Sequence, residues 1–202
     1  MEERIRLIGM PLFIVKNNPG FKNPVVLSKE DEHHLVRVLR AERGQSLTIT
    51  DNHGQTLQVE IVSLKPLTFK ILRKETKPAP VPITVCLPLI EQTRLEWAIE
   101  KLCELNVQSV QLISTERCQW GTLSAKKMER LFKIAEAAQK QCERAWPLLI
   151  SHPLSLTQIV IDPQRQNWFG HQRAYELKES TISNQNVVCS CAHELVRSSC
   201  IF

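Results

Sequence analysis

The first third of the chain alternates hydrophobic and polar residues in short runs. This period of two predicts half-buried β-strands near residues 47–49, 57–61 and 67–71. Residues 51–54, with the sequence Asp-Asn-His-Gly, supply turn chemistry between the first two strands. Several short strands close together on a short stretch of chain are typical of a small β-barrel.

A single short helix is expected before these strands. Ser28 can cap it, and Asp31 three residues later completes part of a capping box. Leu35, Val38 and Leu39 recur at helical spacing and are predicted to form its buried stripe.

Two arginines of the same helix are candidate phosphate ligands. Arg37 and Arg40 lie one turn apart and away from the apolar stripe, so their guanidinium groups could hold successive phosphates of a nucleic acid. The alternative is a pair of solvated surface arginines. The neighbouring His33 and His34 would point about 100° apart on a helix and have no further ligand nearby, so no metal site is predicted.

A proline-rich segment marks a change of pattern. Pro78, Pro80 and Pro82 lie close together, and proline cannot donate to a β-ladder, which predicts an extended linker. The expected domains are residues 1–75 and residues 76–202.

Beyond the linker, continuous apolar runs alternate with helical periods. Residues 83–89 and 107–114 are typical of strands buried on both faces. The helix between them is expected to begin at a capping box formed by Thr93 and Glu96. Strand, helix and strand with short connections predict a parallel sheet and hence an α/β domain. A longer helix, rich in lysine and arginine, is expected over residues 124–143.

The pattern weakens after this helix. Residues 148–150 and 159–161 are short strand candidates, and from Asp162 onward neither period is clear. Residues 162–202 are therefore anomalous for the second domain.

Composition and charge narrow the class of protein. The chain has 202 residues and a net charge of +5, which allows a polyanionic partner without requiring one. Its seven cysteines are scattered and odd in number, so reduced thiols are expected rather than a disulfide framework. No apolar run approaches the ~20 residues that span a bilayer, and no signal peptide is recognisable, so we expect a cytoplasmic protein without a membrane partner.

Four segments in order resemble a known family. They are residues 33–44, residues 94–107, residues 114–117, and the Lys140–Arg144 segment that precedes Pro147. Together they look like the bacterial methyltransferases that modify N3 of a uridine in 16S ribosomal RNA, the small-subunit methyltransferase E family.

This resemblance implies a fold and a reaction. The family has an N-terminal PUA-like β-barrel that binds RNA, followed by a SPOUT-class α/β domain whose parallel sheet ends in a C-terminal trefoil knot. The knot binds S-adenosylmethionine, and the active site lies at the interface of a homodimer. The resemblance therefore implies a methyltransferase that acts on 16S rRNA within the small ribosomal subunit.

The shared motifs also imply site residues. Arg144 and Gln141 are similar to the family's substrate-side catalytic pair, where a fixed cation would stabilise negative charge that develops on the uridine. Arg94, Arg117 and Lys140 match positions expected on the RNA or interface side, in addition to the two arginines of the short helix. Each of these residues could instead be a surface ion-pair residue.

The chain departs from the family pattern at several positions. Glu143 and Asn106 stand where the family usually has glycine, and Asn106 is placed where a helix ends in a left-handed residue. The family's Gly-Pro-Glu-Gly-Gly donor loop and its later Leu-Arg-x-Glu-Thr-Ala segment are missing, and after Leu154 only Gly170 remains. These departures predict an incomplete knot, an unrecognisable donor site and weakened or lost methyl transfer.

Alternative explanations remain open for the tail. A frameshift in the gene between about residues 162 and 194 would account for the missing loop, because one codon choice for residues 194–198 holds Val-Gly-Pro-Glu in another reading frame. The alternative function is a catalytically inactive RNA-binding remnant of the family. A redox or metal-linked role is less favoured, since its candidate ligands match no familiar zinc spacing; they are Cys189, Cys191, His193 and Cys200.

Overall fold

The computed structural model divides the chain into two compact units. It describes residues 12–16, 18–22, 24–115, 123–159, 166–169 and 186–189. The first unit comprises Met1–Ala79 together with Gln139–Pro147, and the second comprises Pro80–Ala138 and Leu148–Phe202. The segment Gln139–Pro147, which the sequence grouped with residues 76–202, is therefore part of the first unit.

The first unit is built on a four-stranded sheet in the order β1-β2-β3-β4. Its strands are β1 (Leu12–Ile14), β2 (Ser46–Thr50), β3 (Gln55–Leu64) and β4 (Leu67–Thr76), with a 3-10 turn η1 (Pro19–Phe21) after β1. β1 is parallel to β2, and the other neighbours are antiparallel. The three predicted strands and the turn at residues 51–54 are confirmed. Inward residues of β2 and β3, such as Ile49 and Ile61, are fully buried and form the core.

The predicted helix cap at Ser28 is confirmed. α1 (Lys29–His33) begins after Ser28, whose Oγ accepts a hydrogen bond from the Asp31 backbone N–H at 3.0 Å. The Ser28 hydroxyl in turn donates to the Asp31 carboxylate at 2.9 Å. This reciprocal contact satisfies one of the otherwise unpaired N–H groups in the first turn.

The predicted apolar stripe of this helix is only partly correct. α1 continues directly into a π-turn, η2 (His34–Val38). Leu35 is buried as expected, but Val38 is 60% exposed and Leu39 is 41% exposed. A π-turn holds more residues than an α-helical turn, so the side chains that follow it rotate away from the face that an α-helical period assigns to them.

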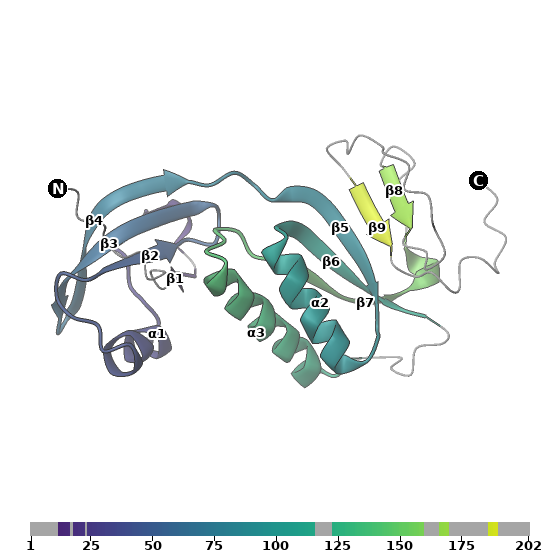
Figure 1. Ribbon diagram of the computed structural model, residues 1–202, viewed down its shortest axis with the longest axis horizontal. Coiled ribbons are helices and arrows are strands. Elements are labelled where there is room, and N and C mark those ends of the chain that lie inside the picture. The colour runs from purple at the N-terminus through teal and green to yellow at the C-terminus, as the bar shows by residue number, and fades with distance from the viewer. Residues whose placement is uncertain are drawn as a thin grey trace, which may run out of the picture. The chain divides into compact units, whose positions relative to one another are not determined.

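The second unit is a parallel sheet with two helices side by side on one face (Figure 1). The strand order is β7-β6-β5-β9-β8, and every neighbouring pair is parallel. The strands are β5 (Val81–Pro88), β6 (Val107–Ser114), β7 (Leu149–Ser155), β8 (Gln166–Phe169) and β9 (Asn186–Cys189); the helices are α2 (Gln92–Glu104) and α3 (Ala125–Gln141), and a 3-10 turn η3 (Leu156–Gln158) follows β7. The predicted α/β domain with a parallel sheet is confirmed.

The hydrophobic core of this unit lies between the helices and the sheet. Ile99 of α2 is fully buried against Val110 and Leu112 of β6, which are also fully buried. Leu131 contributes from α3 with 2% of its surface exposed. These residues follow the periods expected for amphipathic helices and two-sided strands.

The ends of α2 show one error and one success of the sequence analysis. The helix begins at Gln92 without a side-chain cap, so the predicted capping box of Thr93 and Glu96 is wrong. At the other end, Asn106 has φ of 59°, which is the left-handed conformation expected there. Asparagine tolerates this conformation better than most residues.

The anomalous tail contributes to the sheet. β9 pairs with β5 from Ile83 opposite Asn186 to Cys86 opposite Cys189, and β8 pairs with β9. The strand candidate at residues 159–161 is not found at Ile159, which follows the turn η3. The expectations for the knot, the donor loop and the frameshift fall largely outside the described residues, as do Cys191, His193 and Cys200 among the proposed cysteine–histidine ligands.

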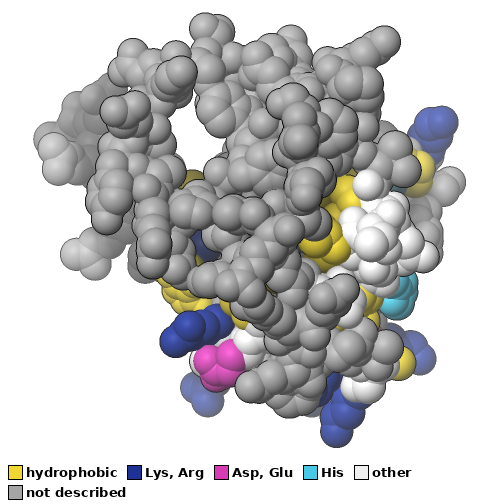
Figure 2. All heavy atoms as spheres, turned by 90° about the vertical axis from the view of Figure 1, so that its right-hand side faces the viewer, with side chains coloured by type: hydrophobic (Ala, Val, Ile, Leu, Met, Phe, Trp, Pro, Cys, Tyr) yellow, Lys and Arg dark blue, Asp and Glu magenta, His cyan; other side chains and the backbone are white. Residues whose placement is uncertain are grey.

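Hydrophobic side chains also reach the surface of the second unit. Leu149 of β7 is 54% exposed and Leu154 is 39% exposed. On the side of the molecule drawn in Figure 2, the lysine and arginine side chains of the described residues stand apart, with hydrophobic side chains between them. That view shows no continuous basic patch among the described residues, so the argument for a nucleic-acid interface depends on other observations.

Candidate nucleic-acid interface

The two arginines predicted to bind phosphate stand on an unusual piece of backbone. Arg37 lies within the π-turn η2, and Arg40 follows it with φ of 50°. Both side chains are exposed. π-turns and non-glycine residues with positive φ are uncommon, and both occur preferentially at functional sites. The exposed Val38 and Leu39 lie between the two arginines in sequence.

The last turn of α3 meets α1 within the first unit. The Lys140 ammonium lies 3.2 Å from the Asp31 carboxylate, which is also the acceptor in the cap of α1. The neighbouring Gln141 side chain is exposed. The structure therefore brings Lys140 beside the helical segment that carries Arg37 and Arg40.

Arg144 differs from Gln141 in its exposure. Only 6% of Arg144 is exposed, and its Nη2 donates to the carbonyl of Pro147 at 3.3 Å. Its backbone N–H donates to the carbonyl of Gln139 at 3.0 Å, which closes the turn after α3. Glu143 within this turn has φ of 53°. A left-handed residue at this place explains physically why glycine is usual there in the family that the chain resembles.

The remaining predicted residues are not part of this cluster as described. Arg94 lies on α2 of the second unit, 80% of its side chain is exposed, and its Nε is 3.5 Å from the Glu91 carboxylate. Arg117 lies outside the described residues. Sequence analysis missed Asn52, Gln139 and Trp146, all of which contact this part of the first unit.

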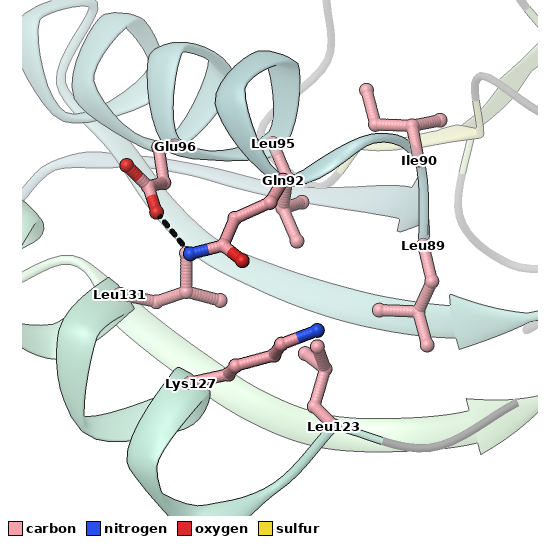
Figure 3. A pocket seen from close by; sticks show the side chains of 8 residues that line it. All are labelled: Leu89, Ile90, Gln92, Leu95, Glu96, Leu123, Lys127 and Leu131. Atoms are coloured by element: carbon pink, nitrogen blue, oxygen red, sulfur yellow. Dashed lines mark hydrogen bonds between the residues drawn. The ribbon is translucent and has the colours of Figure 1, made fainter. Parts of the chain in front are cut away.

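A hollow of the second unit lies where β5 ends and α2 begins (Figure 3). Its volume is about 320 Å³, including open solvent. It is lined mostly by leucine and isoleucine, with three polar residues; the lining residues are Leu89, Ile90, Gln92, Leu95, Glu96, Leu123, Lys127 and Leu131. In parallel α/β sheets, this carboxyl end of the strands is where ligands usually bind.

One carboxylate at this hollow is fixed by two partners. Arg130 Nη2 donates to Glu96 Oε2 at 2.9 Å, and its Nε donates to Oε1. Gln92 Nε2 also donates to Glu96 Oε1 at 2.7 Å, the contact drawn in Figure 3. The hydrogen bonds from Arg130 and then from Gln92 lower the pKa of Glu96 below its usual value. Glu96 is therefore an ionised partner of Arg130 and not a proton donor at neutral pH.

Two further searches cover only the part of the chain that the structure describes. Within it, no group of three or more histidine, cysteine, aspartate or glutamate side chains is arranged to hold a metal ion. Within the same residues, no helix is long and apolar enough to cross a membrane.

Comparison with known proteins identifies both units. Residues 27–72 match the family model described as an RNA methyltransferase PUA domain, and residues 77–191 match the RNA methyltransferase domain. The matched domains define the class, an RNA methyltransferase domain joined to a PUA domain. The second match extends well into the tail that lacked a clear period in the sequence.

Similar proteins refine this class. A ribosomal RNA small subunit methyltransferase E from Synechocystis is 30% identical over 138 residues, which are 67% of this chain and 45% of that protein. The protein of the same name from Buchnera aphidicola is 25% identical over 71% of this chain and 59% of its own length. The chain belongs to the ribosomal RNA small subunit methyltransferase E family of RNA methyltransferases.

A solved structure supports the fold. The Neisseria gonorrhoeae methyltransferase E, bound to S-adenosyl methionine, superposes with a TM-score of 0.76 at 22% identity, covering 89% of this chain and 78% of that one. The chain spans about half the length of the curated relatives it matches.

Proposed function

We propose that this chain takes part in the methylation of a uridine at N3 in 16S rRNA of the small ribosomal subunit, with S-adenosylmethionine as the methyl donor. The observation that carries the proposal is the order of the two family matches, a PUA domain followed by a methyltransferase domain. In this proposal the first unit forms the RNA-binding barrel, and the second acts as a knotted SPOUT domain in a cytoplasmic homodimer.

The RNA contacts proposed for the first unit are electrostatic. The exposed Arg37 and Arg40, together with Lys140, would bind backbone phosphates. The uncommon backbone at both arginines supports this role, because strain persists where the surrounding structure imposes it. Arg94 and Arg117 would add contacts from the second domain.

The proposed substrate-side residues are Gln141 and Arg144. Methyl transfer to uridine N3 requires loss of the N3 proton, which leaves negative charge on the base carbonyl oxygens. A guanidinium held in place by its own turn, as Arg144 is by the Pro147 carbonyl, would stabilise that charge without reorganisation. The exposed amide of Gln141 would orient the base.

The described residues of the second unit do not by themselves fit a methyl donor. None of residues 80–115, 123–138 and 148–159 is glycine, although close approach of a backbone to a ligand usually requires glycine. The hollow at Leu89 is lined mainly by branched apolar side chains. This observation favours a second candidate function, an RNA-binding member of the family that transfers no methyl group.

One pair of measurements separates the two functions. The purified chain is titrated with S-adenosylmethionine by calorimetry, and with small ribosomal subunits that lack the N3 methyl group and a radiolabelled donor. Donor binding with methylation of the subunits supports the proposed function. Salt-dependent binding of the subunits without donor binding supports the second candidate, and failure to bind the subunits contradicts both.

A further inference from the structure

The turn that follows α3 is docked on the turn between β2 and β3. Gln139, which is 3% exposed, donates from Nε2 to Asn52 Oδ1 at 2.7 Å and to the Arg144 carbonyl at 3.0 Å. The amide of Gln139 thus connects the β2–β3 turn to the backbone beside Arg144. We refer to Gln139–Pro147 as the docked turn.

A glycine and a tryptophan complete the docking. The Ala145 carbonyl accepts hydrogen bonds from Thr50 Oγ1 and the Gly54 N–H, both at 3.2 Å. The Trp146 ring lies against Gly54 so closely that a Cβ there would fall 2.4 Å from Trp146 Cζ2, and Gly54 has φ of 89°. Trp146 Nε1 donates to the Lys77 carbonyl at 3.3 Å. Only glycine satisfies both the conformation and the close approach.

The receiving turn is itself rigid. Asp51 is 1% exposed, and its Oδ1 accepts from the backbone N–H groups of His53 at 2.8 Å and Gln55 at 2.9 Å. Its Oδ2 accepts from the Gly20 N–H at 2.7 Å. Three hydrogen bonds to one buried carboxylate fix the loop that meets the docked turn.

We infer, on the basis of the proposed function, that Asn52, Gln139 and the contact between Gly54 and Trp146 are positioning residues of the RNA interface. They hold the docked turn on the RNA-binding unit, so that Gln141 is presented beside α1. The ion pair between Lys140 and Asp31 completes this placement. The RNA interface is therefore composite, because Asn52 and Gln139 are 87 positions apart in sequence.

The test uses the full chain and a fluorescent transcript of 16S rRNA. Asn52→Ala and Gln139→Ala should each weaken RNA binding about fivefold, the size expected for one buried hydrogen bond. The double variant should bind about as weakly as either single variant, because both changes remove the same contact. Since no phosphate contact is lost, the slope of affinity against salt concentration should stay that of the wild type.

Three comparison variants sharpen the test. Arg37→Ala should reduce the salt slope by about one, as expected for a direct phosphate contact. Ser63→Ala removes one hydrogen bond elsewhere in the unit, from the Lys65 N–H at 3.3 Å, and should bind RNA like the wild type. The exchange variant with Asn52→Gln and Gln139→Asn keeps the combined length of the two side chains and should recover most of the affinity.

The outcomes are distinguishable. Hydrogen exchange measured on the docked turn verifies that the alanine variants are folded and that the turn has loosened. If they are loosened yet bind RNA like the wild type, or if the double variant loses the product of the two single effects, the positioning role is overturned. If the wild-type chain does not bind the transcript even at low salt, the proposed function and the inference both fail.

Discussion

The two units hold distant segments together by different means. In the second unit, α2 packs on the sheet through apolar residues such as Ile99 and Leu112, both fully buried. In the first unit, the docked turn is held by polar groups, and Thr50 and Gln139 are 0% and 3% exposed. Apolar burial is not directional, whereas a buried polar group needs a partner at the correct distance and angle. The second unit should therefore respond to lost volume, and the first to a lost hydrogen-bond partner.

The largest effect is expected from a cavity in the second unit. Ile99→Ala should lower the free energy of unfolding by about 3–4 kcal/mol, because the methylene groups removed leave a void in a close-packed core. Trp97→Ala on the same helix is the matched control, since Trp97 is 63% exposed, and it should change stability by less than about 1 kcal/mol.

The measurement is hydrogen exchange followed peptide by peptide, so that each unit reports its own stability. Loss of protection in α2 and β6 is expected for Ile99→Ala. An equal loss for Trp97→Ala would contradict the apolar account of this unit.

A polar substitution in the first unit should have the next largest effect. Asp51→Ala removes the acceptor of three backbone N–H groups and should cost about 3 kcal/mol. Asp51→Asn keeps one acceptor oxygen and should cost about half as much. Protection should fall in the β2–β3 turn and in the docked turn, while α2 keeps its protection.

Glu42→Ala is the control for this change, because the exposed Glu42 side chain lies in the same unit. If Asp51→Ala and Glu42→Ala are equally stable, the buried carboxylate does not organise the turn, and the contrast between the two units disappears.

The same contrast explains what the sequence could predict. β6 was predicted with its full bounds, Val107–Ser114, because a strand buried on both faces leaves a continuous apolar run. The cap of α1 was predicted because its partners are three residues apart. The π-turn was not, since its extra residue leaves no trace in an apolar period that fits an α-helix equally well, and the exposure of Val38 and Leu39 followed from it.

The candidate site was predicted only in part for a related reason. Arg37, Arg40 and Gln141 are exposed and were found from spacing and family motifs. The hydrogen bond of Thr50 to the Ala145 carbonyl joins residues 95 positions apart, and local patterns carry no information about it. The only sequence signal was the glycine of the turn at residues 51–54, which is compatible with an ordinary hairpin as well.

Two left-handed residues provide a smaller test, one in each unit. Glu143 has φ of 53° and Asn106 has φ of 59°. Glu143→Gly should stabilise the first unit by about 1 kcal/mol, because a glutamate side chain is strained in this conformation and glycine is not. Asn106→Gly should gain less than about 0.5 kcal/mol, since asparagine already tolerates it.

Ala137→Gly in α3 is the control for these two changes. The same new residue at an ordinary exposed helical position should destabilise by about 1 kcal/mol. Thermal unfolding of the three variants gives the comparison, and a loss of stability in Glu143→Gly would show that the glutamate side chain makes contacts worth more than the strain.

The smallest effect is expected from the ion pair on the helices of the second unit, which is polar but surface-bound. Hydrogen bonds from Arg130 and then Gln92 lower the pKa of Glu96. A lowered pKa in the folded state contributes stability that is complete above the ordinary glutamate pKa of roughly 4.3 and is lost as the pH falls through the lowered value. Glu96→Gln should therefore have a lower Tm than the wild type at pH 7, and the difference should shrink below about pH 4.

The position of this pair determines how large the difference can be. The Arg130 side chain is 62% exposed, so water and salt screen the attraction, and the shift in Tm should be the least of the four effects. Arg130→Met should remove the same pH dependence, and the double variant should show none beyond either single change. A difference between wild type and Glu96→Gln that is as large at pH 3 as at pH 7 would show that Glu96 stabilises α2 by packing and not by charge, which would place this contact with the apolar core beneath it.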